Sequence, residues 1–206
     1  LVERLFHQYE IDHVINVAAE THVDNSIKNP GAFIHSNITG TFVLLDVARE
    51  YWMDGPFRYK DRFADSRFYQ ISTDEVFGSL DQAGSFTEES PYAPNSPYSA
   101  SKASADLLVR SYHKTYGMNT LISNCSNNYG PKQHNEKLIP TIIRCALSNR
   151  KIPIYGNGKN IRDWLYVRDH CTAIDTIFHH GEYGQTYNIG ADQERENLYV
   201  AACICD

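Results

Sequence analysis

Short apolar runs alternate along this chain with longer stretches in which apolar residues recur every three or four positions. The short runs predict strands at residues 13–18, 68–71, 120–125, 152–155, 164–167 and 186–189. The longer stretches predict helices at residues 1–9, 30–51, 96–116, 138–149 and 169–180. Strands that alternate with helices favour a parallel, doubly wound α/β sheet. The continuous apolar character of residues 13–18 indicates a strand buried on both faces.

The helix expected at residues 96–116 has clear boundary signals. Ser96 is a favourable N-cap, Pro97 suits the first helical position, and Gly117 suits a C-terminal stop.

Composition narrows the class of protein. The chain has 206 residues, of which 42% are hydrophobic and 21% charged, as in an ordinary globular protein. No apolar run approaches the roughly 20 residues that a membrane span needs. The net charge of −6 argues against a nucleic-acid binder. The five cysteines and nine histidines show no metal-ligand spacing, so we expect no metal, reduced thiols and a cytoplasmic protein.

Charge is distributed unevenly along the chain. Residues 132–168 contain eight Lys or Arg and two acidic residues, a local net charge of +6. A basic segment on an acidic protein suits a small polyanion such as a diphosphate better than a polymer. A solvated basic face is the alternative explanation.

A hydroxyl and two carboxylates, Thr73, Asp74 and Glu75, follow the strand expected at residues 68–71. The carboxyl ends of parallel strands border the crevice in which open α/β sheets bind ligands. Two carboxylates there can serve as general acid and general base if their surroundings separate their pKa values. A polar turn with two solvated acids is the simpler alternative.

Tyr98 and Lys102 are four residues apart, so their side chains share one face of the expected helix. A phenol has a pKa of about 10, and lowering it to about 7 requires roughly 4 kcal/mol. An ammonium about 4 Å away supplies about 4 kcal/mol at an effective dielectric constant of 20. The pair can therefore make Tyr98 a base that accepts a proton from an alcohol. Tyr and Lys at this spacing are common on solvated helices, so the neighbouring residues decide whether this pair is functional.

Further motifs make the chain similar to a known family. Residues 72–78 read Ser-Thr-Asp-Glu-Val-Phe-Gly, residues 87–88 read Thr-Glu, and residues 91–102 read Pro-Tyr-Ala-Pro-Asn-Ser-Pro-Tyr-Ser-Ala-Ser-Lys. The other matching segments are residues 18–24, 127–131, 136–140, 153–156, 161–167 and 186–190. Together they resemble the extended short-chain dehydrogenase/reductases over essentially the whole chain. The triplet at residues 73–75 resembles the nucleotide-sugar dehydratases of that family rather than its epimerases.

The resemblance implies an activity: dehydration of dTDP-glucose to dTDP-4-keto-6-deoxyglucose by a lyase that uses bound NAD without net redox change. Tyr98 would take the proton of the sugar 4-hydroxyl while Thr73 holds its oxygen and a hydride leaves C4 for NAD. Glu75 would remove the C5 proton as Asp74 protonates the departing 6-hydroxyl. The hydride would then return to C6, and Lys102 would support Tyr98.

The resemblance also implies which residues contact the ligands. NAD would contact Val17, Ala18, Ala19, Glu20, Thr21, Ser36, Ser72, Tyr98, Lys102 and Asn128. The nucleotide-sugar would contact Thr21, Thr73, Asn127, Lys137, Leu138, Pro153, Ile154, Tyr155, Arg162 and Asn197. Lys137 and Arg162 lie in the basic segment, which favours a role for that segment in binding the diphosphate. A homodimer formed through the helices near residues 32–51 and 98–116 is implied as well.

Residues 1–126 would then form a partial Rossmann-type NAD-binding domain. Residues 127–206 would mainly form a smaller α/β nucleotide-sugar-binding domain, with the strand at 186–189 returning to the main sheet. The Gly-rich turn that cradles a pyrophosphate, and the acid about 20 positions after it, are not in this sequence. We therefore expect a fragment without the N-terminal strands of its sheet, which by itself neither holds NAD nor folds stably.

Two alternatives remain open at this stage. One is another nucleotide-sugar dehydratase, decarboxylase or epimerase of the same superfamily. The other is a catalytically silent member that binds a nucleotide as a sensor or scaffold. The joint presence of Thr73, Asp74, Glu75, Tyr98 and Lys102 argues against a silent member.

Overall fold

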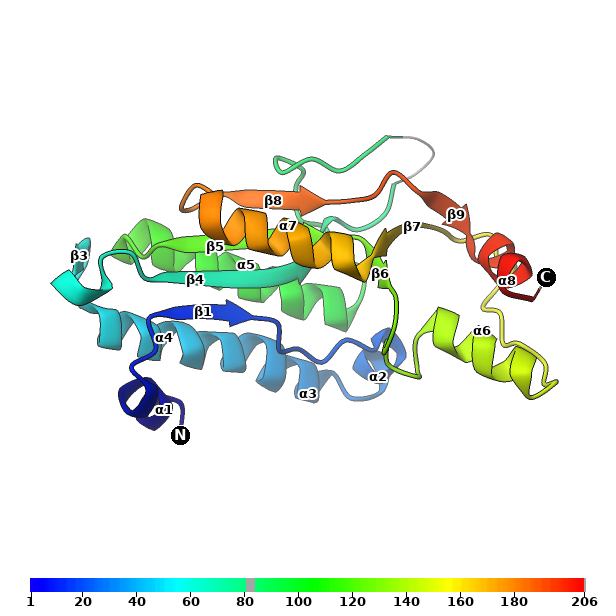
Figure 1. The fold of residues 1–206 in the computed structure, drawn as a ribbon, viewed down its shortest axis with the longest axis horizontal. Coiled ribbons are helices and arrows are strands. Elements are labelled where there is room, and N and C mark those ends of the chain that lie inside the picture. Colours follow the sequence, from blue (N-terminus) through cyan, green and yellow to red (C-terminus); the bar gives the residue numbers. More distant parts are fainter. Residues whose placement is uncertain (81–83, 206) are drawn as a thin grey trace. The chain divides into compact units, whose positions relative to one another are not determined.

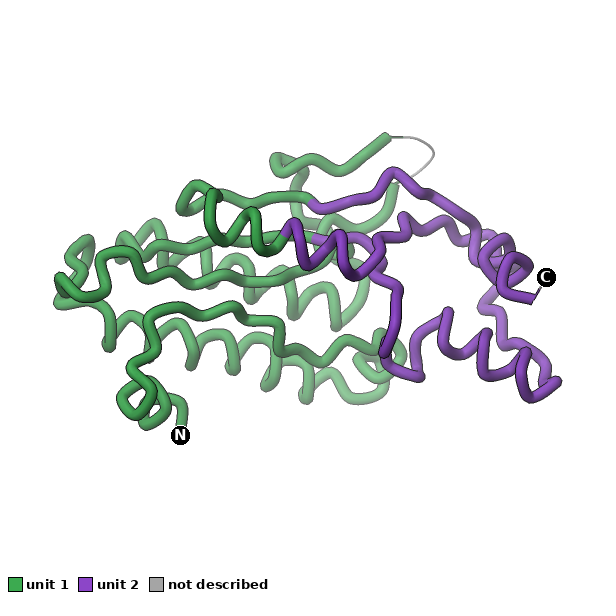
Figure 2. The backbone as a smooth tube through the Cα atoms, viewed as in Figure 1, with its two compact units in different colours: residues 1–124, 174–188 green, residues 125–173, 189–206 purple. Residues whose placement is uncertain are grey.

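The computed structural model describes residues 1–80 and 84–205, which form two compact units (Figure 2). Unit 1 consists of Leu1–Asn124 and Ile174–Asn188, and unit 2 of Cys125–Ala173 and Ile189–Asp206. Each unit is therefore built from two segments of the chain, and unit 1 includes the strand at residues 186–188 in addition to residues 1–124. No helix within the described residues is long and apolar enough to cross a membrane.

Unit 1 is organised around a four-stranded parallel sheet with helices on both faces (Figure 1). Its strands lie in the order β1 (His13–Asn16), β4 (Arg67–Thr73), β5 (Thr120–Cys125) and β8 (Thr186–Ile189). β1 and β4 are paired in parallel, with Val14 opposite Phe68. This arrangement confirms the predicted doubly wound α/β fold.

The remaining elements of unit 1 connect and cover these strands. They are α1 (Val2–Tyr9), α2 (Val23–Lys28), α3 (Pro30–Phe33), the π-helix η1 (Ile34–Thr39), α4 (Gly40–Trp52), the hairpin β2 (Met53–Gly55) and β3 (Arg58–Tyr59), the 3-10 helices η2 (Asp61–Phe63) and η3 (Asp74–Phe77), and α5 (Pro97–Tyr116). Helix α7 (Val167–His180) begins in unit 2 and ends in unit 1.

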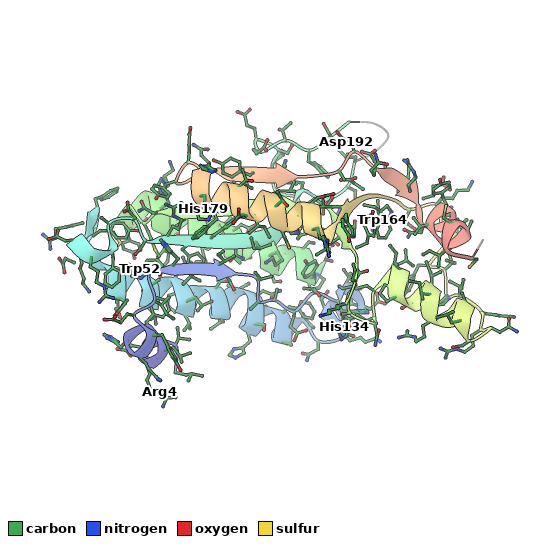
Figure 3. All side chains as sticks on the ribbon, in the orientation of Figure 1. Arg4, Trp52, His134, Trp164, His179 and Asp192 are labelled. Carbon is green, nitrogen blue, oxygen red and sulfur yellow. The ribbon has the colours of Figure 1, made fainter. Side chains whose placement is uncertain are left out.

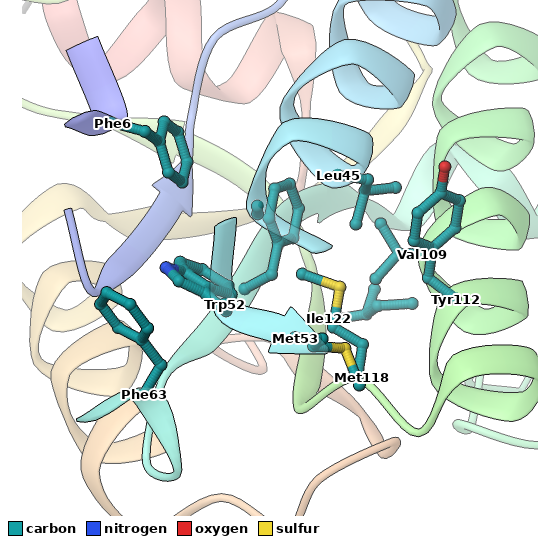
Figure 4. Close-up of a cluster of buried hydrophobic side chains, with 11 residues drawn as sticks. Phe6, Leu45, Trp52, Met53, Phe63, Val109, Tyr112, Met118 and Ile122 are labelled. Carbon is teal, nitrogen blue, oxygen red and sulfur yellow. The ribbon is translucent and has the colours of Figure 1, made fainter. Parts of the chain in front are cut away.

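The two faces of the sheet have separate cores, because successive residues of β4 point to opposite sides. On one side, Phe68 packs in a cluster with Leu45 of α4, Val109 of α5 and Ile122 of β5 (Figure 4). On the other side, Tyr69, Ile71 and Leu121 pack against Ile174, Ile177 and Phe178 of α7. Trp52, labelled in Figures 3 and 4, is fully buried in the first cluster, and its indole N–H donates to the Ile11 carbonyl (2.8 Å).

Helix α5 begins and ends where the sequence predicts. Ser96 caps it, because its Oγ accepts from the Ser99 N–H (3.0 Å) while the Ser99 hydroxyl accepts from the Ser96 N–H (3.0 Å). Gly117 ends it with φ 70°, and a Cβ there would lie 2.3 Å from the Phe57 ring. The position therefore requires glycine for both its backbone angle and its space.

Unit 2 contains a three-stranded sheet in the order β6 (Asn127–Tyr129), β7 (Ile161–Tyr166) and β9 (Glu194–Glu196). β6 and β7 are parallel, and β7 and β9 are antiparallel. Unit 2 also contains the first part of α7 and the helices α6 (Leu138–Leu147) and α8 (Asn197–Cys205), which pack against each other.

Three predictions of secondary structure are wrong. Residues 152–155 form no strand, because Pro153 cannot donate to a ladder. The single helix expected at residues 30–51 is interrupted by the π-helix η1. β1 is not buried on both faces in this chain, since Ile15 is 43% exposed. Short elements that no periodicity marks were missed: α2, the β2–β3 hairpin, β6 and β9.

Candidate active site

The hydroxyl and the two carboxylates of the triplet lie at the carboxyl end of β4. Thr73 is the last residue of the strand, and η3 begins at Asp74. The Thr73 Oγ1 accepts from the Glu75 N–H (3.3 Å) and donates to Asp74 Oδ1 (3.3 Å). Thr73 is buried, while Asp74 and Glu75 are half-buried. The hydroxyl therefore caps the turn and fixes both acids at the edge of the sheet.

Tyr98 and Lys102 project from the first turns of α5, which packs against β4 and η3. Both side chains are buried, with exposed fractions of 8% and 4%. The Lys102 ammonium donates to the Ile71 carbonyl (2.7 Å), two residues before Thr73. The edge of Phe33 meets the Tyr98 ring at a centroid distance of 6.3 Å. The five predicted catalytic residues thus all lie in unit 1, at the end of β4, on η3 and on α5, which packs against both of these elements.

The segment after β1, residues 17–21, also lies at the carboxyl edge of this sheet. Asn16 at the end of the strand is 4% exposed, whereas Val17 is 66% exposed. Ala18, Glu20 and Thr21 are exposed as well, and Ala19 is half-buried. Small side chains and an open backbone would let a ligand lie directly against the segment.

Asn37 holds that segment in place. Its Oδ1 accepts from the Glu20 N–H (2.8 Å), and its Nδ2 donates to the Glu20 carbonyl (3.0 Å). The same Nδ2 donates to the Ser101 hydroxyl (2.8 Å), which in turn donates to the Tyr98 carbonyl (2.7 Å). Asn37 therefore links the segment after β1 to the turn of α5 that carries Tyr98.

Sequence reasoning missed Asn37, although it selected the neighbouring Ser36. Ser36 is exposed on η1, whereas Asn37 is 2% exposed. A π-helix is a frequent companion of functional sites, but its extra residue per turn is invisible to a search for a 3.6-residue period. The one available signal was a polar Asn within an apolar helical pattern.

Ser72, expected to contact the cofactor, is 4% exposed and points toward α5. Its hydroxyl donates to Asp106 Oδ2 (2.5 Å). Asp106, which sequence reasoning did not select, is buried on α5 one turn after Lys102.

The residues expected to contact the nucleotide-sugar lie mainly in unit 2, as does the whole basic segment. They are Asn127 on β6, Lys137 and Leu138 at the start of α6, Pro153, Ile154 and Tyr155 in an irregular segment, Arg162 on β7, and Asn197 at the start of α8. Thr21 and Thr73 belong to unit 1.

One of these unit 2 residues, Ile154, packs beside Leu198 at Gly158. A Cβ on Gly158 would lie 2.7 Å from Ile154 and 2.5 Å from Leu198, so only glycine lets these two side chains come so close. The Gly158 carbonyl accepts from the Leu198 N–H (3.1 Å). Arg162 faces Arg195 across the β7–β9 pair, and α8 begins two residues after Arg195. The structure thus brings Ile154, Asn197 and Arg162 into one part of unit 2.

Asn128, the remaining expected cofactor contact, is engaged at both ends of its amide. Its Nδ2 donates to the Ser126 carbonyl (3.1 Å) and to Cys125 Sγ (3.3 Å). Its Oδ1 lies 2.7 Å from His170 Nδ1. Burial lowers the pKa of His170, which favours the neutral imidazole. The Asn128 side chain therefore fixes the backbone after β5, and its contact with a cofactor stays a prediction.

No three His, Cys, Asp or Glu side chains within residues 1–80 and 84–205 are placed to hold a metal ion. His179, labelled in Figure 3, is exposed on the last turn of α7, and its Nε2 lies 3.5 Å from Asp175 Oδ1.

Known proteins are similar to this chain in both sequence and fold. A dTDP-glucose 4,6-dehydratase of Xanthomonas campestris is 54% identical over 205 residues, which are 100% of this chain and 58% of that protein. The crystal structure of a dTDP-glucose 4,6-dehydratase of Bacillus anthracis in complex with NAD has a TM-score of 0.85 at 44% identity, covering 98% of this chain and 59% of that one. The same enzyme of Streptomyces venezuelae, with NAD and TYD bound, has a TM-score of 0.89 at 40% identity, covering 99% of this chain and 60% of that one.

These matches confirm the resemblance to nucleotide-sugar dehydratases, and this chain spans about 58% of the length of the curated relatives. A protein-family model described as GDP-mannose 4,6 dehydratase matches residues 1–206. The chain belongs to the GDP-mannose 4,6-dehydratase family.

Proposed function

We propose that the full-length protein dehydrates dTDP-glucose to dTDP-4-keto-6-deoxyglucose with NAD as a bound catalyst. The observation that carries this proposal is the position of Thr73, Asp74 and Glu75 at the carboxyl end of β4, with the Lys102 ammonium on the carbonyl of Ile71 in the same strand. Tyr98 would then serve as the base of the redox step, and Asp74 and Glu75 as the acid and base of the elimination, at one edge of the sheet. An alcohol dehydrogenase needs only the base of the redox step.

The residues present fit a dinucleotide at this edge. The exposed backbone after Asn16 gives a flat ligand room, and Lys102 and Tyr98 supply donors that suit ribose hydroxyls. Val17, Ala18, Ala19, Glu20, Thr21, Ser36, Ser72, Tyr98, Lys102 and Asn128 would hold NAD. Bound NAD would supply a hydride acceptor for C4 and a hydride donor for C6.

The side chains of unit 1 would handle the protons. Tyr98, supported by the positive charge of Lys102, takes the proton from the 4-hydroxyl, and Thr73 Oγ1 holds that oxygen. The resulting 4-keto group acidifies the C5 proton, which Glu75 removes. Asp74 protonates the 6-hydroxyl so that it leaves as water.

Unit 2 would bind the nucleotide-sugar. Lys137 and Arg162 carry the charge for a diphosphate, and both lie in the basic segment. The other proposed contacts in this unit are Asn127, Leu138, Pro153, Ile154, Tyr155 and Asn197. The sequence identity to dTDP-glucose dehydratases supports dTDP as the nucleotide, although the family as a whole is named for a GDP-sugar.

The proposal also includes a cytoplasmic homodimer. Exposed apolar side chains support an interface formed by α4 and α5: Phe42 is 43% exposed and Leu107 is 56% exposed. On α5, Ser99, Ser101 and Ala105 are buried within the chain itself and are not available to this interface. Sedimentation of the full-length protein would test the dimer.

Incubating the full-length protein with dTDP-, UDP-, CDP- and GDP-hexoses tests the proposed substrate. We expect the 4-keto-6-deoxy product from dTDP-glucose, at a kcat/KM at least tenfold above that of the other nucleotides. Turnover of a UDP-, CDP- or GDP-sugar in its place would support another enzyme of the superfamily. Binding without turnover of any sugar would support the silent member.

A further inference from the structure

A buried carboxylate that the proposed mechanism does not use lies directly behind the catalytic residues. Asp106 is 1% exposed and follows Lys102 by one turn of α5. Burying an acid in this way is unfavourable unless other groups satisfy it. Its surroundings therefore show what the residue does.

Two hydroxyls from different parts of unit 1 converge on one oxygen of this carboxylate. The Ser72 hydroxyl of β4 donates to Asp106 Oδ2 (2.5 Å). The Tyr92 hydroxyl, from the connection between η3 and α5, donates to the same Oδ2 (3.3 Å). The second oxygen, Oδ1, is buried and has no hydrogen-bond partner in the described part of the chain.

These bonds join α5 to the strand end that carries the triplet. Lys102 binds the carbonyl of Ile71, and Asp106 binds the hydroxyl of Ser72. Two consecutive residues of β4, directly before Thr73, are thus held by two successive turns of the helix that carries Tyr98.

Tyr92 connects these bonds between α5 and β4 to η3, the turn that holds Asp74 and Glu75. Its ring meets Phe77 of η3 edge-on at a centroid distance of 5.4 Å. The next residue, Ala93, donates its N–H to the Val76 carbonyl (2.9 Å). A Cβ on Gly78 would lie 2.4 Å from the Ala93 carbonyl oxygen, so the connection runs directly against the end of η3.

We propose that Asp106 is a positioning residue, which fixes the spacing between the Thr73–Asp74–Glu75 turn and the Tyr98–Lys102 pair without contacting the substrate. This inference rests on the proposed function, because it assigns those five residues to the reaction. It adds a residue that acts through Ser72 and Lys102.

The charge of Asp106 also reaches the proposed base. Burial raises the pKa of its carboxyl to about 7, against the opposing effect of the Lys102 charge and the two hydroxyls. The titratable groups that face it are Lys102 on its own helix and Tyr92 on the connection, while β4 contributes only the Ser72 hydroxyl. Tyr98 lies two turns away, about 12 Å along the helix axis. An ionised Asp106 therefore opposes the formation of the Tyr98 phenolate.

Replacing Asp106 with Asn in the full-length protein tests both effects. We expect kcat to fall roughly ten- to hundredfold with KM changed less than threefold, because the reacting groups lose their alignment. We expect the acidic limb of the kcat/KM profile to move lower by up to about one pH unit, because losing a like charge two helical turns from Tyr98 favours the phenolate. A purely structural defect would lower kcat and leave the limb in place.

Two further variants separate position from charge. Tyr92→Phe removes one hydroxyl bound to Asp106 but keeps the charge, so kcat should fall while the limb stays. Asp175→Asn removes an exposed acid from α7 and should change neither. The pH profiles are measured with whichever nucleotide-sugar the protein turns over, so a wrong substrate assignment does not affect the comparison.

Hydrogen exchange of the protein without substrate gives a readout that does not depend on turnover. Amides of residues 72–75 should exchange faster in Asp106→Asn and Tyr92→Phe, and at the native rate in Asp175→Asn. Native exchange at these amides together with an unshifted limb in Asp106→Asn would overturn the proposal.

Discussion

Two adjacent carboxylates can divide the work of acid and base only if one holds a proton when the other does not. Asp74 and Glu75 follow each other in the chain, but their surroundings differ. Asp74 Oδ1 accepts from the Thr73 hydroxyl, whereas Glu75 gives its backbone N–H to the same hydroxyl. The Thr73 hydroxyl thus contacts the carboxylate of Asp74 and the backbone of Glu75.

Replacing Glu75 with Gln tests the assignment of the C5 base. Gln has nearly the same shape but cannot take up a proton, so kcat for dehydration should fall at least 100-fold. Exchange of the C5 proton with solvent, followed by NMR in deuterium oxide, should fall in parallel. Glu89→Gln, at an exposed position of the following connection, is the matched control. Unchanged turnover in Glu75→Gln would show that another residue is the base.

At the scale of elements, the site depends on a helix that is not regular. Helix η1 carries one turn with a π-type spacing, which turns Asn37 inward while Ser36 and Thr39 stay exposed. The Asn37 carbonyl also accepts a hydrogen bond from the Thr41 hydroxyl (2.7 Å), which ties the irregular turn to the first turn of α4. This turn fixes the segment after β1 against α5.

Replacing Asn37 with Ala should destabilise the full-length protein by about 1–3 kcal/mol, because the Glu20 N–H and carbonyl both lose their partner. Denaturant unfolding measures this loss. His35→Ala, at an exposed position of the same turn, should stay within about 0.5 kcal/mol of the native protein. Equal stability of the two variants would contradict the role given to Asn37.

The helix and strand that hold the candidate site were largely predictable, because short-range sequence signals mark them. Helix α5 has its capping serine, its first-turn Pro97 and its terminal Gly117, all of which are short-range signals. Strand β4 is marked by an apolar run. Ser72 at its end was recognised, but not its partner Asp106, because a bond between residues 34 positions apart leaves no trace in a periodicity.

At the scale of the whole molecule, the two units carry different chemistry. Unit 1 holds the five predicted catalytic residues, and unit 2 holds the basic segment with Lys137 and Arg162. The division into two segments per unit was not predictable from composition. Helix α7 belongs to both, and its sequence has one unbroken helical period.

We propose that one site of the full-length protein oxidises C4, eliminates water across C5 and C6, and reduces C6. Supplying that protein with dTDP-glucose that carries deuterium at C4 tests this sequence of steps. We expect the label to move to C6 of a 4-keto-6-deoxy product, while C5 takes its hydrogen from solvent. A label that stays at C4, or is lost to solvent without appearing at C6, would rule out transfer of the hydride from C4 to C6.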